Sequence, residues 1–422
     1  MSADTAVPLA FATESHVCAA MRAEIVTDFD ELTSLDHEWT QLWNESPSAT
    51  IFQSLPWQRA WWKAFGSGLQ LCTPVIRKDN EVVGILPLIR DHTTVRFLGT
   101  PGTDYCDILC REELAPIVLR MALKSLLKMR GWRTCRLDNL RDDSQLFRHL
   151  GSLPVAIQNR IQVLPETHRS SLLLGGCCNE VIASMRRKPT LKRHRNKMNR
   201  SGNVSFRHVE ERADAHLRLA TLFQQHIGRR GMLGAQSQFL SPAWRAFYSA
   251  LVNELDPKKE LRFSILELDG YPIACHFGFE CRESLTLYKP AFDTNFASLS
   301  PGDVLLDKLL SYAGERHLKE VDFTIGRESY KQHFTNHTSE MFTMVLDRRK
   351  FFSKARGLLY PLCECLEASS AVRSIKKFLL RGQRSFNALR AKLPGTTVFC
   401  AVKRHWSTMS ATPTGEPDRF LR

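Results

Sequence analysis

One stretch, residues 284–334, constrains the fold more than any other part of this 422-residue chain. Apolar and polar side chains alternate over Leu285–Tyr288, which predicts a short strand. Ser300-Pro301-Gly302-Asp303 then has the composition of a helix start: a capping serine, a proline at the first helical position and an acid three residues after the cap. Apolar residues recur at helical spacing from there to Ala313, so the segment predicts an amphipathic helix.

A second strand and a short helix complete this stretch. Residues 321–325 alternate, Gly326 ends the strand, and residues 328–334 have a helical pattern. A helix N-terminus between two strands offers free N–H groups and a favourable dipole end to an anion. Gly302 would let a ligand approach the backbone closely. Two interpretations remain open: a site for a phosphate-bearing donor such as coenzyme A (CoA) or a nucleotide, and an ordinary capped crossover helix.

Composition narrows the class of protein. The 58 Lys and Arg residues against 44 Asp and Glu give a net charge of +14, which favours an anionic partner such as a nucleotide, nucleic acid, anionic lipid or sugar phosphate. A hydrophobic content of 43% predicts a globular core. The sequence contains no run of 18 apolar residues, so no transmembrane helix is predicted. The first 22 residues lack the features of a secretory signal and are expected to form a disordered leader.

The cysteines give no sign of a metal site or a disulfide framework. The 12 of them form no C-x-x-C pair and no zinc-finger spacing with histidine. Reduced thiols in a cytoplasmic protein are the simplest interpretation. The G-x-S-x-G, P-loop, G-x-G-x-x-G and H-E-x-x-H motifs are absent too, which disfavours hydrolases of the triad type, nucleotide-motif enzymes and zincins.

Strands and helices alternate along both halves, which predicts an α/β (α+β) fold. Trp39, Trp57, Trp61 and Trp62 lie at helical spacing and are interpreted as core rather than as a sugar or acyl site. In the first half we expect strands at 71–76, 82–89, 95–98, 107–109 and 134–137 and a helix at 115–129. In the second half we expect strands at 204–208, 261–268, 272–280, 284–288, 320–325 and 341–346, helices at 217–227, 242–255 and 301–317, and a flexible loop at 228–234.

Two segments are strongly basic. Residues 179–203 carry eight Lys and Arg residues and no aromatic side chain, so a solvated or substrate-facing helix anchored by Val181, Met185, Leu191 and Met198 is favoured over nucleic-acid binding. Residues 348–393 combine cations with apolar residues at helical spacing. That pattern fits either a helix at an anionic membrane or a helix packed on the core. Residues 394–422 are expected to be disordered.

The signature letters S-P-G-x-x-L-L at 300–306 and D-F-x-x-G-x-x-x-Y-K at 322–331 resemble the C-terminal part of the CelD/BcsL-like (BioF-like) acetyltransferases. That family belongs to the GNAT superfamily and is related to the Fem-type aminoacyl transferases. The tryptophan-rich opening, Gly84–Leu88 and Phe97-Leu98-Gly99 fit the same family, so the resemblance runs from about Glu24 to about Leu346.

The resemblance implies two tandem GNAT-like domains, each a mixed sheet flanked by helices, plus a basic helical C-terminal extension. The expected segments are a leader (1–22), an N-terminal GNAT-like domain (23–178), a basic connecting helix (179–203), a C-terminal GNAT-like acetyltransferase domain (204–347), the extension (348–393) and a tail (394–422). It also implies acetyl-CoA or another acyl-CoA as co-substrate, and no metal. Typical GNAT proteins carry Q/R-x-x-G-x-G/A in the pyrophosphate loop, whereas residues 295–302 hold one glycine, so an aminoacyl-tRNA donor stays open.

Site residues follow from the resemblance and from the chemistry of acyl transfer, which needs a donor site, a base and a group that stabilises an oxyanion. The expected donor-binding residues are Ser300, Pro301, Gly302, Gly326, Tyr330 and Lys331, the last matching a phosphate-contacting lysine of Fem-type enzymes. The catalytic candidates are Tyr288 as a proton donor, with Asp322 and His276 as bases. Each has a structural alternative: Tyr288 as a core aromatic, Asp322 as a residue that orients the loop at Gly326, and His276 as a buried, satisfied side chain.

The leading hypothesis is a cytoplasmic acyltransferase, soluble or peripheral at the inner face of the membrane. It would move an acyl group from acyl-CoA to an amine or hydroxyl of a saccharide, a polysaccharide precursor or a lipid-linked intermediate, because members of the resembling family often accompany exopolysaccharide genes. The alternatives are a Fem-type aminoacyl-tRNA-dependent transferase, and a non-catalytic basic protein that binds nucleic acid or an anionic membrane. Nucleic acid is not expected as a partner unless tRNA is the donor.

Overall fold

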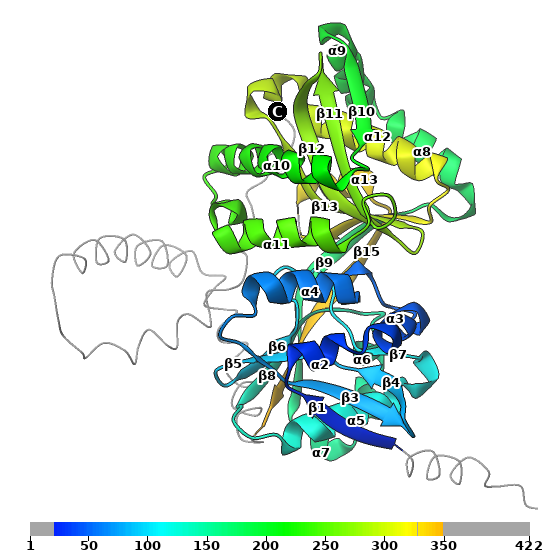
Figure 1. Cartoon of the computed structure of the whole chain (residues 1–422). Helices are drawn as coiled ribbons and strands as arrows, with labels where there is room; N and C mark the ends of the chain where they lie inside the picture. The colour runs from blue at the N-terminus through cyan, green and yellow to red at the C-terminus, as the bar shows by residue number, and fades with distance from the viewer. Residues whose placement is uncertain (1–20, 327, 349–422) are drawn as a thin grey trace, which may run out of the picture. The chain divides into compact units, whose positions relative to one another are not determined.

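The computed structural model describes residues 21–326 and 328–348 of the chain (Figure 1). Its first half contains β1 (Met21–Val26), α2 (Phe29–Thr33), α3 (Asp36–Glu45), α4 (Leu55–Phe65), β2 (Gln70–Leu71), β3 (Thr73–Lys78), β4 (Glu81–Ile85), β5 (Leu88–Asp91), β6 (Thr94–Phe97), β7 (Leu109–Cys110), α5 (Ala115–Lys128), β8 (Thr134–Arg141), α6 (Gln145–Arg148), α7 (Val155–Gln158) and β9 (Ile161–Leu173).

The second half contains α8 (Cys178–Arg186), α9 (Pro189–Ser201), β10 (Val204–His208), α10 (Arg212–Met232), α11 (Pro242–Glu254), β11 (Leu261–Leu268), β12 (Tyr271–Cys281), β13 (Ser284–Phe292), the 3-10 turn η6 (Thr294–Leu299), α12 (Pro301–Glu315), β14 (Glu320–Ile325), α13 (Ser329–Phe334) and β15 (His337–Asp347). We call residues 21–158 the N-terminal lobe and residues 178–325 the C-terminal lobe.

One long sheet links the two lobes. Its strand order is β10-β11-β12-β13-β14-β9-β15-β8-β6-β5-β2, and a second, four-stranded sheet has the order β1-β3-β4-β7. β9 is antiparallel to both β14 and β15, and β15 is antiparallel to β8. Figure 1 shows β9 and β15 where the lobes meet. The last described strand of the chain therefore pairs with a strand of the N-terminal lobe.

Helices cover both faces of the C-terminal part of the sheet. α10 and α11 pack on the face that carries Phe263, Phe277 and Phe279. α12, with α8 and α9, packs on the opposite face, which carries Leu266 and Ala274. In the N-terminal lobe α5 packs on β1, β3 and β4. The predicted fold class, mixed sheets flanked by helices, is confirmed.

The tryptophan residues belong to the hydrophobic core, as predicted, although Trp62 is only partly buried. Trp39, Trp57 and Trp61 are each 1% exposed or less. The Trp57 ring packs edge-on against Phe247 of α11 at 5.2 Å between centroids, and its indole N–H donates to the Thr103 hydroxyl at 2.9 Å. A buried aromatic cluster of this size makes a large contribution to stability, so the two lobes share one hydrophobic core.

Several elements differ from expectation. Residues 228–232 continue helix α10 and do not form a flexible loop. The basic segment is not one helix but two, α8 and α9, because Pro189 cannot continue the preceding helix. Its predicted anchors do face the core: Leu191 and Met198 are buried, and Val181 and Met185 are partly buried. The disordered leader was expected to reach residue 22, but Met21 and Arg22 already belong to β1, paired with β3. Residues 1–20, 349–393 of the basic extension and the tail lie outside the described residues.

Strand β9 was not predicted from the sequence. It spans Ile161–Leu173, and its pattern of exposure is irregular because it pairs with two strands and serves both lobes. No helix in the described ranges 21–326 and 328–348 is long and apolar enough to cross a membrane.

Candidate active site

The candidate site lies where β13 and β14 diverge. These parallel strands pair only through Ser284–Thr286 and Glu320–Asp322, at the start of each strand. A narrow pocket of about 40 Å³ lies in the region beyond this pairing, between β12, β13 and α12. We call it the β13–α12 pocket, and it is lined by Arg229, His276, Leu287, Pro290, Ala291, Phe292, Gly302, Asp303, Leu305, Leu306, Leu309, Phe323 and Tyr330. A volume near that of one water molecule means that a larger ligand must move lining side chains apart.

The start of α12 forms one wall of this pocket. Pro301 is the first helical residue, and a Cβ on Gly302 would meet only the Phe292 ring, at 3.7 Å. The predicted capping box is wrong: Ser300 adopts a left-handed conformation with φ of 53° and makes no side-chain cap. Asp303 instead accepts from the ring of His194 at 2.6 Å between Nδ1 and Oδ2. The first turn of α12 is thus fixed by α9 and leaves the backbone at Gly302 accessible.

Arg229 supplies a cation beside that helix start. It comes from the last turns of α10, donates to the Pro290 carbonyl at 3.2 Å, and lies 5.7 Å from the centroid of Phe292. Burial lowers the pKa of its guanidinium, which still stays charged because the reference value is so high. Arg229 was not among the predicted site residues, because residues 228–234 were expected to form a flexible loop.

A cluster of charged residues lies on the other side of β13. It is built by the N-terminal-lobe loop 99–105, which brings Asp104 to Lys289 and Lys331. Burial raises the pKa of Asp104 to about 6, the two lysines oppose this shift, and the nearby Asp322 adds to it. Burial also lowers the pKa of Lys289, against the attraction of Asp104. A carboxyl group with a pKa near 6 is well matched to proton transfer at neutral pH.

The cluster and the pocket share their walls. Pro290 lines the pocket and its neighbour Lys289 belongs to the charged cluster; Tyr330 lines the pocket and its neighbour Lys331 belongs to the cluster. Asp104 and Lys289 were not among the predicted residues. They lie on a loop and near the end of a strand, where no local sequence pattern shows which distant segment they will contact.

Asp322 has the contacts of a residue that orients a loop. Its carboxylate accepts from the Tyr105 hydroxyl at 2.8 Å and from the backbone N–H of Thr324 at 2.8 Å, and Arg169 lies 3.5 Å away. It is 3% exposed. Gly326 follows at a φ of 134°, a conformation that strongly favours glycine. These contacts leave the role of Asp322 as a base a prediction, and Asp104 is the more accessible carboxylate.

Tyr288 belongs to the aromatic core and also reaches the loop. Its ring packs against Trp57 and Phe279, and its hydroxyl donates to the Gly102 carbonyl at 2.5 Å. Burial and the nearby Asp104 hold its pKa well above the usual range for tyrosine, so the hydroxyl keeps its proton. It fits the role of a proton donor better than that of a base.

Lys331 is turned inward. Its ammonium group contacts Glu328 at 2.8 Å and donates to the Ile325 carbonyl at 2.9 Å, and the residue is 3% exposed. It would have to leave these partners to reach a donor phosphate, so that role stays a prediction. Tyr330 lines the pocket, where burial raises its pKa.

His276 lies beneath α12, on the pocket side of β12. It is fully buried, and burial lowers the pKa of its imidazole to about 3, so the ring is neutral at physiological pH. A neutral ring of this kind is a hydrogen-bonding group, and it is a poor base above pH 4. The structure therefore brings His276, Gly302 and Tyr330 to one pocket, and places Tyr288, Asp322 and Lys331 around the adjoining cluster.

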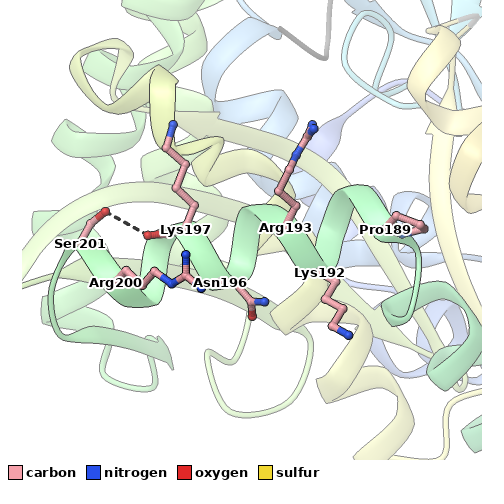
Figure 2. A pocket seen from close by; sticks show the side chains of 7 residues that line it. All are labelled: Pro189, Lys192, Arg193, Asn196, Lys197, Arg200 and Ser201. Carbon is pink, nitrogen blue, oxygen red and sulfur yellow. Dashed lines mark hydrogen bonds between the residues drawn. The ribbon is translucent and has the colours of Figure 1, made fainter.

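A second surface pocket follows helix α9. Figure 2 shows Lys192, Arg193, Lys197 and Arg200 along it. Lys197 donates to the Ser298 carbonyl at 2.8 Å, just before α12, and the other three side chains are exposed. Two more cations of the segment, Arg186 and Arg195, instead turn to α12. Within the ranges 21–326 and 328–348, no group of three or more His, Cys, Asp or Glu side chains is placed to hold a metal ion.

Comparisons with known proteins agree with this architecture. Residues 184–332 match the acetyltransferase (GNAT) domain family. No curated protein matches the chain. The solved structure of FemX superposes over 76% of this chain and 96% of its own, with a TM-score of 0.51 and 10% identity. The structure of L-PGS from Bacillus licheniformis covers 77% of this chain and 95% of its own, with a TM-score of 0.50 and 8% identity. At such identities the likeness concerns the fold alone. The chain has a GNAT-type acyltransferase fold, with a GNAT acetyltransferase domain at residues 184–332.

Proposed function

We propose that this protein is an acyltransferase that takes its acyl group from acyl-CoA bound at the β13–α12 pocket. The acceptor would be an amine or hydroxyl held beside Asp104. One observation carries the proposal. The pocket that holds the open helix start at Gly302 and the cation Arg229 lies beside the charged cluster, because β13 and α13 contribute residues to both. That cluster contains Asp104, whose carboxyl group has a pKa near 6. A donor site next to a base is the arrangement that direct acyl transfer requires.

The residues present fit such a donor. The start of α12 and Arg229 suit an anionic phosphate group. The pocket beyond them is lined mainly by Leu, Phe, Pro and Ala side chains, which suit a slender apolar arm. Acyl-CoA, when bound, supplies the acyl group as a reactive thioester.

The chain's own groups then divide the work. Asp104 takes the proton from the acceptor's amine or hydroxyl, and Lys289 and Lys331 favour its ionised form. Tyr288 keeps its proton at neutral pH because burial and the nearby Asp104 raise its pKa, so we assign it to the developing negative charge or the leaving thiolate. Asp322 and Gly326 fix the loop against which Asp104 lies, and packing of the two lobes excludes water from the site.

The acceptor class rests on the resemblance to the CelD/BcsL-like family. We propose a saccharide, a polysaccharide precursor or a lipid-linked intermediate, modified in the cytoplasm or at the inner face of the membrane. The basic extension at 348–393 would provide the membrane contact.

A Fem-type reaction with aminoacyl-tRNA as the donor is the second candidate. The exposed cations along α9 favour it, because such a row would suit a nucleic-acid backbone (Figure 2). One of them, Lys197, contacts the Ser298 carbonyl just before α12. Narrow, apolar walls in the β13–α12 pocket favour acyl-CoA instead.

Ligand-induced stabilisation separates these candidates. The full chain is heated with acetyl-CoA, longer acyl-CoAs, aminoacyl-tRNA or RNA in turn. At a ligand concentration one hundred times Kd, a bound ligand stabilises the fold by about 2.7 kcal/mol. Stabilisation by acyl-CoA, followed by release of free CoA thiol when amine or hydroxyl acceptors are added, is the expected result. Stabilisation by aminoacyl-tRNA alone would favour the Fem-type reaction, and stabilisation by plain RNA alone would favour a non-catalytic binding protein.

A further inference from the structure

His276 is a buried polar group that has no side-chain partner on its pocket side. The backbone carbonyl of Thr286 lies beside the ring and opposes the lowering of its pKa. Among the described residues neither ring nitrogen makes a hydrogen bond of normal geometry, although the side chain is 0% exposed. Buried polar groups are almost always paired, and leaving one unpaired costs about 1–3 kcal/mol. The site needs an explanation that neighbouring side chains do not supply.

The fold makes room for this imidazole. Gly278 lies two residues further along β12 and has no side chain, so the His276 ring can lie against it. A Cβ at Gly278 would collide with this ring and with the Thr286 carbonyl. The pairing of β12 with β13 shifts register between Phe277 and Phe279, at that same glycine. The ring is therefore accommodated by a specific local distortion of the sheet beside the pocket.

His276 also ends a row of polar residues on this face of the sheet. His208 on β10 pairs with Ser264 on β11, and Ser264 pairs with His276 on β12. His208 and Ser264 form a hydrogen bond, at 3.0 Å between Nδ1 and Oγ. Cross-strand partners share one face of a sheet, so the row leads to the pocket, and His276 is the member that lines it.

We propose that His276 is the hydrogen-bonding anchor for the amide-bearing arm of the donor, a pantetheine thioester. This inference rests on the proposed function. A neutral imidazole has one N–H donor and one acceptor nitrogen, which match the C=O and N–H of an amide. The half-buried Arg229 and Gly302 would face the phosphate end, while the fully buried His276 would meet the arm deeper in the pocket.

Two variants and two ligands test the assignment in the full-length protein. His276→Phe keeps the ring volume without its nitrogens, and His276→Gln keeps a donor and an acceptor. Titration calorimetry compares CoA with adenosine 3′,5′-bisphosphate, which lacks the pantetheine arm. His208→Phe is the matched control, because this ring lies in the same polar row but does not line the pocket.

We expect His276→Phe to weaken CoA binding by about three- to tenfold, the effect of one hydrogen bond. Binding of the bisphosphate should not change, His276→Gln should retain most of the CoA affinity, and His208→Phe should bind both ligands like the parent. If His276→Phe leaves CoA affinity unchanged, or weakens both ligands equally, the inference is wrong.

A spectroscopic signature does not depend on whether the variants fold equally well. In the parent labelled with ¹⁵N-histidine, the imidazole signals that disappear in His276→Gln should shift on addition of CoA but not of the bisphosphate. Signals that stay in place when CoA binds would overturn the assignment while leaving the proposed function intact. A parent that binds no CoA at all would overturn both.

Discussion

At the scale of single residues, Asp104 carries the chemistry of the proposed reaction. Replacing it with asparagine removes the base and keeps the size of the side chain. General-base catalysis typically contributes 10²–10⁴-fold, so kcat should fall by about that factor while CoA affinity stays within about twofold. For the parent, kcat/KM should fall below pH about 6, because protonated Asp104 cannot accept a proton. Steady-state kinetics of thiol release check both.

The exposed Asp142, changed to asparagine, is the control for this measurement and should behave like the parent. A parent-like rate for Asp104→Asn, or a pH profile that is flat between pH 5 and 8, would assign the base to another group.

The same variant should be more stable than the parent at neutral pH. The pKa of Asp104 is 3.8 in the unfolded chain and about 6 in the folded one, so the folded state binds more protons between these values. The resulting penalty is absent below pH about 4, grows as the pH rises through that window and is complete above pH about 6. Asp104→Asn should relieve it, by no more than about 3 kcal/mol at pH 8. Urea unfolding at pH 8 and pH 4 measures the difference, which should disappear at pH 4; an equal or lower stability at pH 8 would contradict the raised pKa.

Sequence patterns predicted some site residues and missed others for a physical reason. Gly302, Tyr330 and His276 line the pocket because they lie on elements whose local signals are strong: a proline-led helix start and alternating strands. Asp104 and Arg229 reach the candidate site only through contacts with β13, a segment far away in the chain. A turn-rich loop and a pair of arginines carry no information about which strand they will contact.

At the scale of elements, α12 forms one wall of the proposed donor pocket. Helices α8 and α9 pack against α12 and form ion pairs with it. Asp307 on α12 is 0% exposed and accepts from Arg186 at 3.0 Å and from Arg195 at 2.9 Å. Removing one partner of a buried ion pair leaves the other charges uncompensated. Asp307 is therefore the carboxylate that holds both of these arginines against α12.

Asp307→Ala should lower the free energy of unfolding by about 1.5–3 kcal/mol, because two partly exposed arginines lose a charge-assisted hydrogen-bond partner. Lys308→Ala, one residue further along the same helix, is the control and should change stability by about 0.5 kcal/mol or less. Denaturant titration followed by circular dichroism measures both. A loss for Asp307→Ala no greater than that of the control would mean that solvent or another group already compensates the arginines.

Element prediction succeeded where propensity and packing agree. The α12 helix, strand β14 and the hairpin of β11 and β12 were all expected, since a proline at the first helical position, alternation and the Asp269-Gly270 turn point the same way. The helical end of α10 was not expected, because two glycines each weaken a helix by about 1 kcal/mol. Packing overrides that cost: Gly228 lies against Thr294, and Arg229 bonds to β13.

At the scale of the whole molecule, the two lobes share one sheet and one cluster of buried residues. β9 and β15 carry the sheet from one lobe to the other, the Trp57 cluster fills the space between them, and the N-terminal loop provides Asp104 to a site whose other walls are C-terminal. Local sequence patterns cannot show such long-range pairing. Resemblance predicted two tandem domains, and the shared sheet and core are what the structure adds.

Calorimetric titration of CoA into the full chain and its Gly302→Val variant tests whether the β13–α12 pocket binds the acyl-CoA donor. We predict one site per chain in the parent and at least a tenfold loss of affinity in the variant. The added side chain would occupy the approach to the α12 backbone, where an added Cβ would meet only the Phe292 ring and would otherwise face open space. The thermal unfolding of both proteins should be similar, as should that of the control Gly314→Ala on the same helix. A parent that binds no CoA, or a folded Gly302→Val variant that binds it as tightly as the parent, would contradict the account.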